Sequence, residues 1–378
     1  MIHFILARNN SNTIKKYLGK RGRSIASVIR IIYYDDLKEL LNLKTSAIIF
    51  SDFDRLNSFQ LEEVKKIFTQ IKVKYPQLIL INDPSKVKLR FELLKQLKKT
   101  GINNYDVFRS IEPLVNLSYP VFLREENNHT GALSELIYDF KSLEKNILAL
   151  NLQGYPTKNL LAVEYANVVT TGGIYKKYSA LKVMDNIYPR QLDYNMHWMV
   201  KSNICFDTYP VEDYLKEFEI YMNENPHKDW LDQIFNIAGI DYGRIDYGVY
   251  EGKPIVWEIN LNPDYGNRKR NRVEQQKELV DRIRDEFHVK LLNKFSEIDA
   301  HEDTHIELEI SERVLKTMKT SNLVLFWEKF HNLYKTKKPI FQKLVRFVRA
   351  FSLVIAQFLL FVLKSFGYSP LRNSKSQP

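Results

Sequence analysis

The stretch "GRIDYGVYEGKPIVWEINLNPDYG", which begins at Gly243, constrains the fold most, because two runs of alternating polar and apolar residues flank a turn sequence. Successive side chains of a β-strand point to opposite faces, so Arg244 and Asp246 share one face of the first run. In the second run, Glu258 and Asn260 share a face in the same way. A three-residue turn, "EGK", predicts an antiparallel hairpin with Asp246 opposite Glu258 and Arg244 opposite Asn260.

This hairpin predicts a cation site. Opposed Cβ atoms in an antiparallel pair lie about 5 Å apart, which is close enough for Asp246 and Glu258 to share a cation. Asp246, Glu258 and Asn260 offer only oxygen ligands, which suit a hard cation such as Mg²⁺. From the spacing alone, two other interpretations stay open: a solvent-facing polar side of an edge hairpin, or an acid paired with Arg244.

The rest of the chain predicts several packed units. A length of 378 residues is too great for one ordinary domain. Near the N-terminus, the apolar runs "IHFILA", "SAIIF" and "LILI" alternate with helical patterns, including helices from Leu61 onward and over roughly 85–100. We expect a small N-terminal α/β domain over 1–105, a second region over 106–300 and a C-terminal tail over 301–378.

Composition excludes two classes of protein. The single cysteine, Cys205, cannot form an internal disulfide, which favours a reducing, cytoplasmic compartment over a secreted scaffold. The net charge is +11, but from residue 320 onward ten Lys and Arg residues stand against one acid, which accounts for +9 of it. The remainder of the chain is nearly neutral, and binding of nucleic acid through the basic tail would lack basic and aromatic residues interleaved on a sheet, so nucleic acid is not expected as a partner.

The hairpin resembles the closing signature of the ATP-grasp enzymes, in which an Arg-x-Asp strand precedes a Glu-x-Asn strand that ends in Asn-Pro. "LILINDPSKVKLRFELLKQLKKTGI" is similar to the family's segment between its first two domains, and "YPVFLR" and "LLAVEYA" are similar to its nucleotide-binding strands. The resemblance covers approximately residues 76–266. It implies an α/β fold of ATP-grasp type: a small N-terminal α/β domain, a two-part nucleotide-binding α+β region and a C-terminal helical tail.

The resemblance also implies roles for the residues of the hairpin. Asp246, Glu258 and Asn260 would be ligands of one or two Mg²⁺ ions that bridge the phosphates of ATP. Arg244 would contact a phosphate or the reacting carboxylate. Asn262 has two alternative roles, as a further metal ligand or as the residue that shapes the turn after the strand.

Further residues receive roles from the central part of the resemblance. Glu164 would lie beside the adenine or ribose, with an exposed strand-end acid as the alternative. Lys177 and Arg190 are candidate phosphate contacts, Arg190 also as a catalytic cation beside Arg244, against the alternative of solvated strand charges. His197 is the one histidine that could contribute, but a surface or satisfied core histidine is the favoured interpretation, because a lone His carries little information.

The sequence departs from the family pattern at two places. Arg124 stands where the family usually has a nucleotide-binding Lys, and a planar guanidinium differs from the point charge of Lys. The loop "EENNHTGAL" has one glycine, Gly131, where many members have several. The family's earlier Lys, in the linking segment, corresponds to Lys88 or Arg90.

The predicted function is that of an ATP- and Mg²⁺-dependent ligase, which joins a small-molecule or peptide carboxylate to an amine through an acylphosphate. One alternative is a phosphotransferase that uses the same nucleotide site. Another is a degenerate, non-catalytic ATP-grasp scaffold. Cell-surface polymer or peptide modification is a fitting context for the ligase.

The C-terminal tail predicts attachment to a membrane surface. Its apolar stretch, residues 350–363, is fourteen residues long and is interrupted by Ser352 and Gln357. A transmembrane helix needs about 20 apolar residues, whereas an amphipathic helix with basic residues lies in the membrane interface. We therefore expect a peripheral protein at the inner membrane face, with a helix packed on the core or on a second subunit as the alternative.

Overall fold

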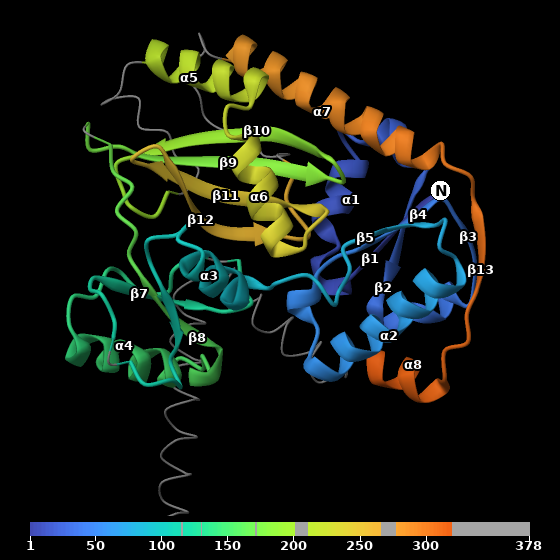
Figure 1. Cartoon of the computed structure of the whole chain (residues 1–378), viewed down its shortest axis with the longest axis horizontal. Helices are drawn as coiled ribbons and strands as arrows, with labels where there is room; N and C mark the ends of the chain where they lie inside the picture. The colour runs from blue at the N-terminus through green and yellow to red at the C-terminus, as the bar shows by residue number, and fades with distance from the viewer. Residues whose placement is uncertain (115, 130, 171, 201–210, 266–276, 320–378) are drawn as a thin grey trace, which may run out of the picture. The chain divides into compact units, whose positions relative to one another are not determined.

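The computed structural model describes residues 1–319 except 115, 130, 171, 201–210 and 266–276 (Figure 1). The segment predicted to bind a membrane lies in residues 320–378, outside the described part. Within the described part, no helix combines the length and the apolar character that crossing a bilayer requires.

The N-terminal region is built on a four-stranded parallel sheet with strand order β2-β1-β4-β5. Every residue of β1 is buried, as expected for a strand covered on both faces. This region contains the expected alternation of strands and helices. Its elements are β1 (Ile2–Leu6), α1 (Asn12–Leu18), β2 (Ile29–Tyr33), β3 (Asn42–Thr45), β4 (Ala47–Phe50), α2 (Ser58–Lys74) and β5 (Ile79–Ile81).

The two helices predicted here are present, with one shifted start. α2 begins at a capping box in which Asn57 and Gln60 exchange side-chain and backbone hydrogen bonds. α3 (Arg90–Lys99) begins five residues later than residue 85, and it ends before Gly101, whose φ of +74° suits glycine. Lys88 therefore lies in the linker before the helix rather than on the helix.

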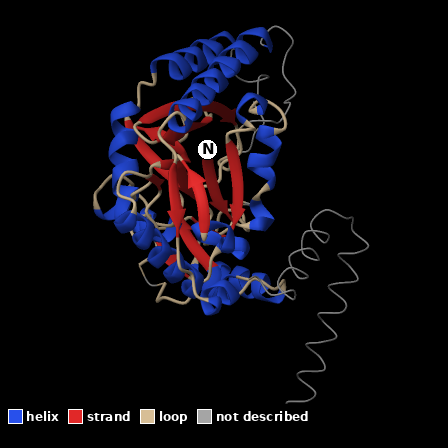
Figure 2. Ribbon diagram, turned by 90° about the vertical axis from the view of Figure 1, so that its right-hand side faces the viewer, coloured by secondary structure: helices blue, strands red, loops and turns tan. Residues whose placement is uncertain are grey.

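The region after the linker contains two antiparallel sheets, flanked by helices (Figure 2). The smaller has the strand order β6-β8-β7 and the larger has the order β10-β9-β11-β12. Together with the parallel N-terminal sheet, they confirm the predicted α/β fold class. The elements are β6 (Val107–Arg109), β7 (Val121–Glu125), α4 (Phe140–Leu152), β8 (Leu160–Glu164), β9 (Tyr175–Val183), β10 (Asn186–Asn195), α5 (Val211–Glu224), α6 (Lys228–Ala238), β11 (Tyr242–Tyr250) and β12 (Lys253–Asn260).

The last described elements return to the N-terminal region. After α7 (Lys277–Asp299), β13 (Thr304–Glu307) pairs antiparallel with β3, and α8 (Glu312–Met318) follows. These residues belong to one compact unit, Met1–Lys319. The unit thus includes the first part of the stretch predicted as the tail, and the domain boundaries at 105 and 300 stay predictions.

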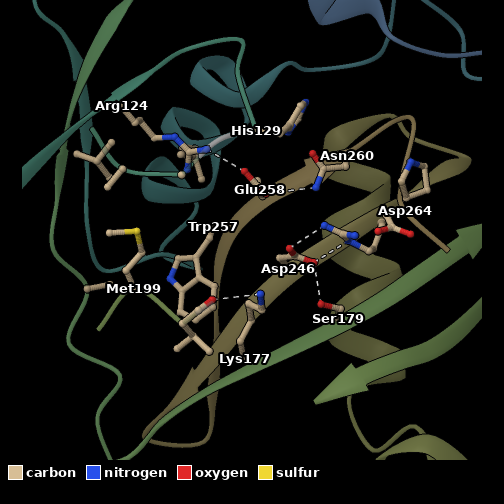
Figure 3. A pocket seen from close by; sticks show the side chains of 18 of the residues that line it. Arg124, His129, Lys177, Ser179, Met199, Asp246, Trp257, Glu258, Asn260 and Asp264 are labelled. Carbon is tan, nitrogen blue, oxygen red and sulfur yellow. Dashed lines mark hydrogen bonds and ion pairs between the residues drawn. The ribbon is translucent and has the colours of Figure 1, made fainter. Parts of the chain in front are cut away.

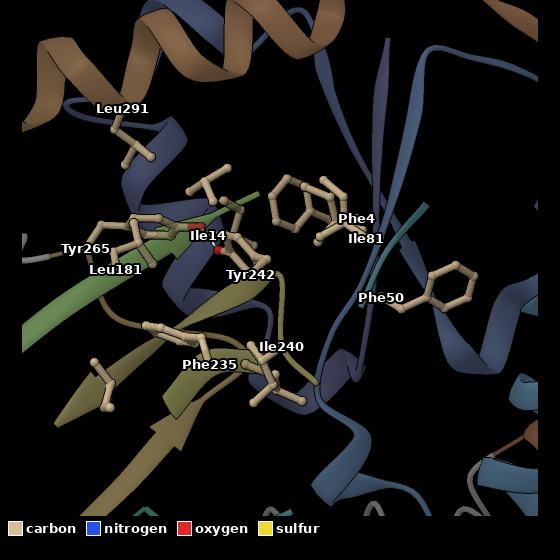
Figure 4. Packing of buried hydrophobic residues seen from close by; sticks show 14 of the residues in the cluster. Phe4, Ile14, Phe50, Ile81, Leu181, Phe235, Ile240, Tyr242, Tyr265 and Leu291 are labelled. Carbon is tan, nitrogen blue, oxygen red and sulfur yellow. Dashed lines mark hydrogen bonds between the residues drawn. The ribbon is translucent and has the colours of Figure 1, made fainter. Parts of the chain in front are cut away.

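One hydrophobic core extends from the N-terminal sheet to the larger antiparallel sheet (Figure 4). Phe4 on β1 meets Tyr242 on β11 edge to face, with ring centroids 5.5 Å apart. Leu291 on α7 and Phe235 on α6 belong to the same core. Because the two sheets share this core, the loops at the end of the parallel sheet are held against the end of β12.

Candidate functional site

The predicted pairing of the hairpin is confirmed. β11 and β12 pair antiparallel with Arg244 opposite Asn260 and Asp246 opposite Glu258. Asp246 and Asn260 are buried, and Glu258 is only partly exposed. The acids of this hairpin therefore face the protein interior rather than open solvent.

The turn that closes the hairpin differs from the prediction. Tyr250 pairs with Lys253, so the turn has two residues, Glu251 and Gly252, rather than three. Both have positive φ, 48° and 70°, as a type I′ turn requires. Tyr247 pairs with Val256 and Asp246 pairs with Glu258, so Trp257 is an extra residue in a bulge on β12. This extra residue compensates for the shorter turn and restores the predicted pairing of the two acids.

A cavity of about 600 Å³ opens beside the polar face of the hairpin (Figure 3). Both acids of the hairpin line it, and it also receives side chains from the N-terminal region and from both antiparallel sheets. One group of lining side chains is cationic: Arg55, Arg124, Lys177, Arg190 and Arg244. A second group is aromatic or apolar: Phe122, Trp198, Met199 and Trp257. This composition suits a ligand with an anionic part and a flat apolar part.

Asp246 is held by partners from its own sheet. Arg244 donates two hydrogen bonds to it, from Nε at 2.9 Å and from Nη2 at 3.0 Å. Ser179, which is opposite Asp246 on β9, donates a third at 2.8 Å. Burial lowers the pKa of Arg244, but the charges of Asp246 and Glu258 outweigh it, so that the pKa is raised and the guanidinium stays charged. The alternative of an acid paired with Arg244 is thus present in the structure.

Glu258 is held by partners from other segments. Its Oε2 accepts hydrogen bonds from Nη2 of Arg90 at 2.5 Å and from Nη2 of Arg124 at 2.9 Å. Asn260 donates to its Oε1 at 3.2 Å. Burial opposes ionisation of Glu258, but the two guanidinium charges outweigh it and hold its pKa well below the ordinary value. The carboxylate is therefore ionised at neutral pH.

The donor set of the hairpin fits a hard cation. Asn260 is 5% exposed, its amide nitrogen is used by Glu258, and its Oδ1 has no hydrogen-bond partner among the described residues. A buried amide oxygen without a donor is a free ligand position beside two carboxylates. In the described part of the chain, no three His, Cys, Asp or Glu side chains gather as a metal site. A cation here would complete its shell with water or phosphate oxygens, as Mg²⁺ commonly does.

Lys177 and Arg190 both line the cavity, as predicted for phosphate contacts. Nζ of Lys177 donates to the backbone oxygen of Val200 at 3.2 Å and lies 3.6 Å from the buried carboxylate of Asp193. Arg190 is 8% exposed and donates from Nη1 to Gln191 at 3.0 Å. Neither is therefore a solvated surface charge, and their roles as phosphate contacts stay predictions.

Glu164 also lines the cavity, but both its oxygens have backbone partners. Oε2 accepts from the amide of Asp106 and Oε1 from the amide of Ser118, each at 2.8 Å. The residue is 6% exposed, so it is not the exposed acid of the alternative interpretation. Beside it, the rings of Phe122 and Trp198 lie 5.0 Å apart and form an apolar wall.

The structure distinguishes between Lys88 and Arg90, the two cations predicted for the linking segment. Neither Lys88 nor Arg90 lines the main cavity, and Nζ of Lys88 donates to the backbone oxygen of Ile237 on α6 at 2.8 Å. Arg90, two residues later, is the first residue of α3 and contacts Glu258. Burial and the charge of Arg124 lower the pKa of Arg90 to about 10, so it remains cationic at neutral pH. Arg90 therefore contacts an acid that lines the cavity, whereas Lys88 bonds to the backbone of α6.

Asn262 connects the end of the hairpin to the N-terminal region. Its Nδ2 donates to Asp52 and to the backbone oxygen of Asn10, both at 3.0 Å. Its Oδ1 accepts from Thr13 at 3.1 Å. Burial and the charge of Asp54 raise the pKa of Asp52 to about 6. Of its two alternative roles, these bonds support the shaping of the chain after the strand.

Three residues at the site were not predicted. Ser179 could not be found, because nothing in the sequence states the pairing of β9 with β11, and Trp257 enters the cavity wall through an unforeseen bulge. His129 lies in the glycine-poor loop and contacts Arg90 and Asp54. By contrast, the other histidine considered, His197, is exposed at the rim and lies 3.7 Å from a surface acid.

Comparison with known proteins finds similarity in structure only. No known protein-family profile matches the chain, and no curated protein matches its sequence. Solved structures that match include a D-alanine–D-alanine ligase from Bacillus anthracis complexed with ATP, with 12% identity over 78% of this chain and 98% of that chain, at a TM-score of 0.43. An L-amino acid ligase from Bacillus licheniformis matches with 11% identity over 69% and 66%, at a TM-score of 0.34.

A third match is a RimK domain protein of ATP-grasp type from Sphaerobacter thermophilus. It has 11% identity to this chain over 78% of this chain and 98% of its own, at a TM-score of 0.42. The matched structures thus include the ATP-grasp type, which the hairpin signature resembles. At these identities and TM-scores, the case for a function rests on the residues of the cavity.

Proposed function

We propose that the chain is an ATP-dependent ligase of ATP-grasp type, whose nucleotide binds in the cavity beside β11 and β12. The observation that carries this proposal is the hairpin itself: Asp246 and Glu258 are opposed in register, and the amide oxygen of the adjacent Asn260 has no hydrogen-bond partner in the part of the chain that the structure describes. Cationic side chains on the cavity wall suit phosphates, and the aromatic wall suits a base.

The hairpin residues would hold Mg²⁺, which when bound would neutralise phosphate charge and orient the transferred group. Asp246, Glu258 and Asn260 are its proposed ligands. Arg124 and Arg244 now pair with the two carboxylates. We infer that they exchange these partners for phosphate or substrate carboxylate oxygens as the nucleotide binds, since Arg forms bidentate bonds with both anions.

The proposed reaction needs charge and position rather than a covalent nucleophile. A substrate carboxylate oxygen attacks the terminal phosphorus of ATP, ADP leaves, and an acylphosphate forms. An amine then attacks the acyl carbon and inorganic phosphate leaves. Arg244, Arg190 and Lys177, which line the cavity, would stabilise the charge that develops on the transferred group.

The test is calorimetric binding of a non-hydrolysable ATP analogue to the full chain, with and without Mg²⁺. We expect binding that requires Mg²⁺ and that weakens about tenfold or more in Asn260→Ala, because that change removes one ligand oxygen. Asn186→Ala, at an exposed position outside the cavity, is a matched control. Lack of binding by folded wild-type protein would contradict the proposal.

A non-catalytic scaffold is the second candidate, and one observation favours it. Glu258 is already neutralised by two arginines, so the protein satisfies this acid without a cation. A scaffold of this kind would show no ATP turnover with any carboxylate and amine pair. It would also retain its cellular role in Asp246→Asn, whereas the ligase would lose that role.

The membrane part of the proposal rests on the sequence of residues 320–378 alone. We propose that this basic and apolar segment attaches the chain to an anionic membrane surface, where a small-molecule or peptide carboxylate and an amine are joined. Sedimentation of the full chain with vesicles of phosphatidylserine and phosphatidylcholine tests this. Binding that falls as salt rises would support it, and equal recovery with and without vesicles would contradict it.

A further inference from the structure

One buried side chain, that of Arg90, holds the loop that follows β7. Nη1 of Arg90 donates to the backbone oxygens of Glu125 at 3.3 Å, Glu126 at 2.5 Å and Asn128 at 2.9 Å. The side chain of Arg90 is 5% exposed, and its Nη2 faces Glu258. Arg90 therefore sets the shape of this loop and the position of a proposed metal ligand at once.

His129, in this loop, contacts both Arg90 and Asp54. Nη2 of Arg90 lies 3.3 Å from Nδ1 of His129, and Nε2 of His129 lies 3.0 Å from Oδ2 of Asp54. A guanidinium can only donate, so Nδ1 of His129 accepts and Nε2 carries the proton that is donated to Asp54. The two neighbours thus select one tautomer and one ring orientation of His129.

Asp54 belongs to the N-terminal region, in the short 3-10 turn Phe53–Arg55 that follows β4. The turn is preceded by Asp52, whose φ of +54° places it in the left-handed region. Burial raises the pKa of Asp54, but the hydrogen bond from His129 and the charges of Arg55 and Arg90 outweigh it and leave the pKa lowered. The acid is therefore ionised and a strong acceptor for His129.

We propose that Asp54, His129 and Arg90, here called the brace, are positioning residues through which the N-terminal region sets the distance between the β7 loop and Glu258. The proposal rests on the proposed function, because the loop and Glu258 flank the same nucleotide. Arg124, on β7 just before the loop, and His129, within the loop, both line the cavity. A loop released from the brace would no longer present Arg124 and its backbone at a fixed distance from the carboxylate.

The brace is tested in the full chain with Asp54→Ala, His129→Ala, the double variant and the conservative His129→Gln. The control is Asp232→Ala, which removes an exposed ion pair with Lys228 on α6. Circular dichroism establishes that each variant is folded. Amide hydrogen exchange over residues 122–129 without ligand and calorimetric binding of an ATP analogue with Mg²⁺ are then measured.

We expect each single Ala variant to exchange amide hydrogens faster in this loop and to bind the analogue about tenfold more weakly. Exchange and binding should be unchanged in the control. The double variant should bind the analogue at most about twofold more weakly than the weaker-binding single variant, because both changes break one connected path. His129→Gln, which keeps a donor for Asp54, should recover much of the affinity.

Two results overturn the brace in distinguishable ways. If wild-type protein binds the analogue and the variants bind equally, with unchanged exchange, the brace has no positioning role. Additive losses in the double variant would likewise contradict a connected path. If folded wild-type protein does not bind the analogue, the proposed function fails, and the positioning role fails with it.

Discussion

The two carboxylates of the hairpin face each other but are supported differently. Asp246 is held by Arg244, two residues away on the same strand, and by Ser179 on the adjacent strand. Glu258 is held by Arg90 on α3 and Arg124 on β7. One half of the site is therefore made by a single sheet, and the other half forms only when separate segments pack together.

This difference predicts a difference in energetic cost, and Glu258→Gln should have the largest effect. The change leaves Arg90 and Arg124, whose side chains are 5% and 10% exposed, without their counter-charge. Loss of one partner from a buried ion pair costs about 3–5 kcal/mol of unfolding free energy. Urea denaturation measures it, with Glu62→Gln, which removes an exposed pair with Lys65, as the control. Equal stability of the two variants would contradict buried pairing at Glu258.

The contribution of Glu258 should also disappear in acid. Its pKa is lower in the folded protein than in the unfolded chain, where it is about 4.3. A depressed carboxylate pKa stabilises the fold above the unfolded value, and this stabilisation declines as pH falls toward the folded pKa. The difference in unfolding free energy between wild type and Glu258→Gln should therefore be greatest near neutral pH and shrink below about pH 4. A difference that grows on acidification would refute the assignment.

Asp246→Asn should have a smaller effect, of about 1–3 kcal/mol on the unfolding free energy. The amide oxygen of Asn can still accept from Ser179, and the charge of Glu258 continues to act on Arg244. Thermal unfolding of this variant should be compared with Asp232→Asn, whose exposed pair contributes little. A loss as great as that of Glu258→Gln would remove the contrast between the two halves.

Ser179→Ala should have the smallest effect, about 1 kcal/mol, since it deletes a single hydrogen bond while Arg244 retains both of its bonds to Asp246. Chemical denaturation resolves a change of this size when the slope is unchanged. No measurable change would mean that Arg244 alone positions the acid.

The same contrast explains what the sequence could predict. Alternation along two strands placed Asp246 opposite Glu258 correctly, although the predicted turn was one residue too long, because the bulge at Trp257 compensated for the difference. Contacts within one sheet follow from local periodicity. The partners of Glu258, 168 and 134 residues away, depend on how helices and sheets pack, which local periodicity does not encode.

In the linking segment, too, local periodicity could not predict which residue contacts the site. Its helical pattern extends back to residue 85, so Lys88 and Arg90 were equivalent candidates on one predicted helix. In the structure, the amide of Lys88 donates to the backbone oxygen of Ala238 at 2.8 Å, and the residue precedes the helix. This tertiary contact delays the helix to Arg90 and decides which cation reaches the site.

The most direct test of the hairpin as a metal and nucleotide site is electron paramagnetic resonance of Mn²⁺, used in place of Mg²⁺, with the full chain and a non-hydrolysable ATP analogue. We expect wild-type protein to bind Mn²⁺ and the analogue together, with a spectrum that differs from that of the free Mn²⁺–nucleotide complex. Asp246→Asn and Asn260→Ala should lose that spectrum while remaining folded. An unchanged spectrum in both variants would place the metal away from the hairpin and would contradict the central claim.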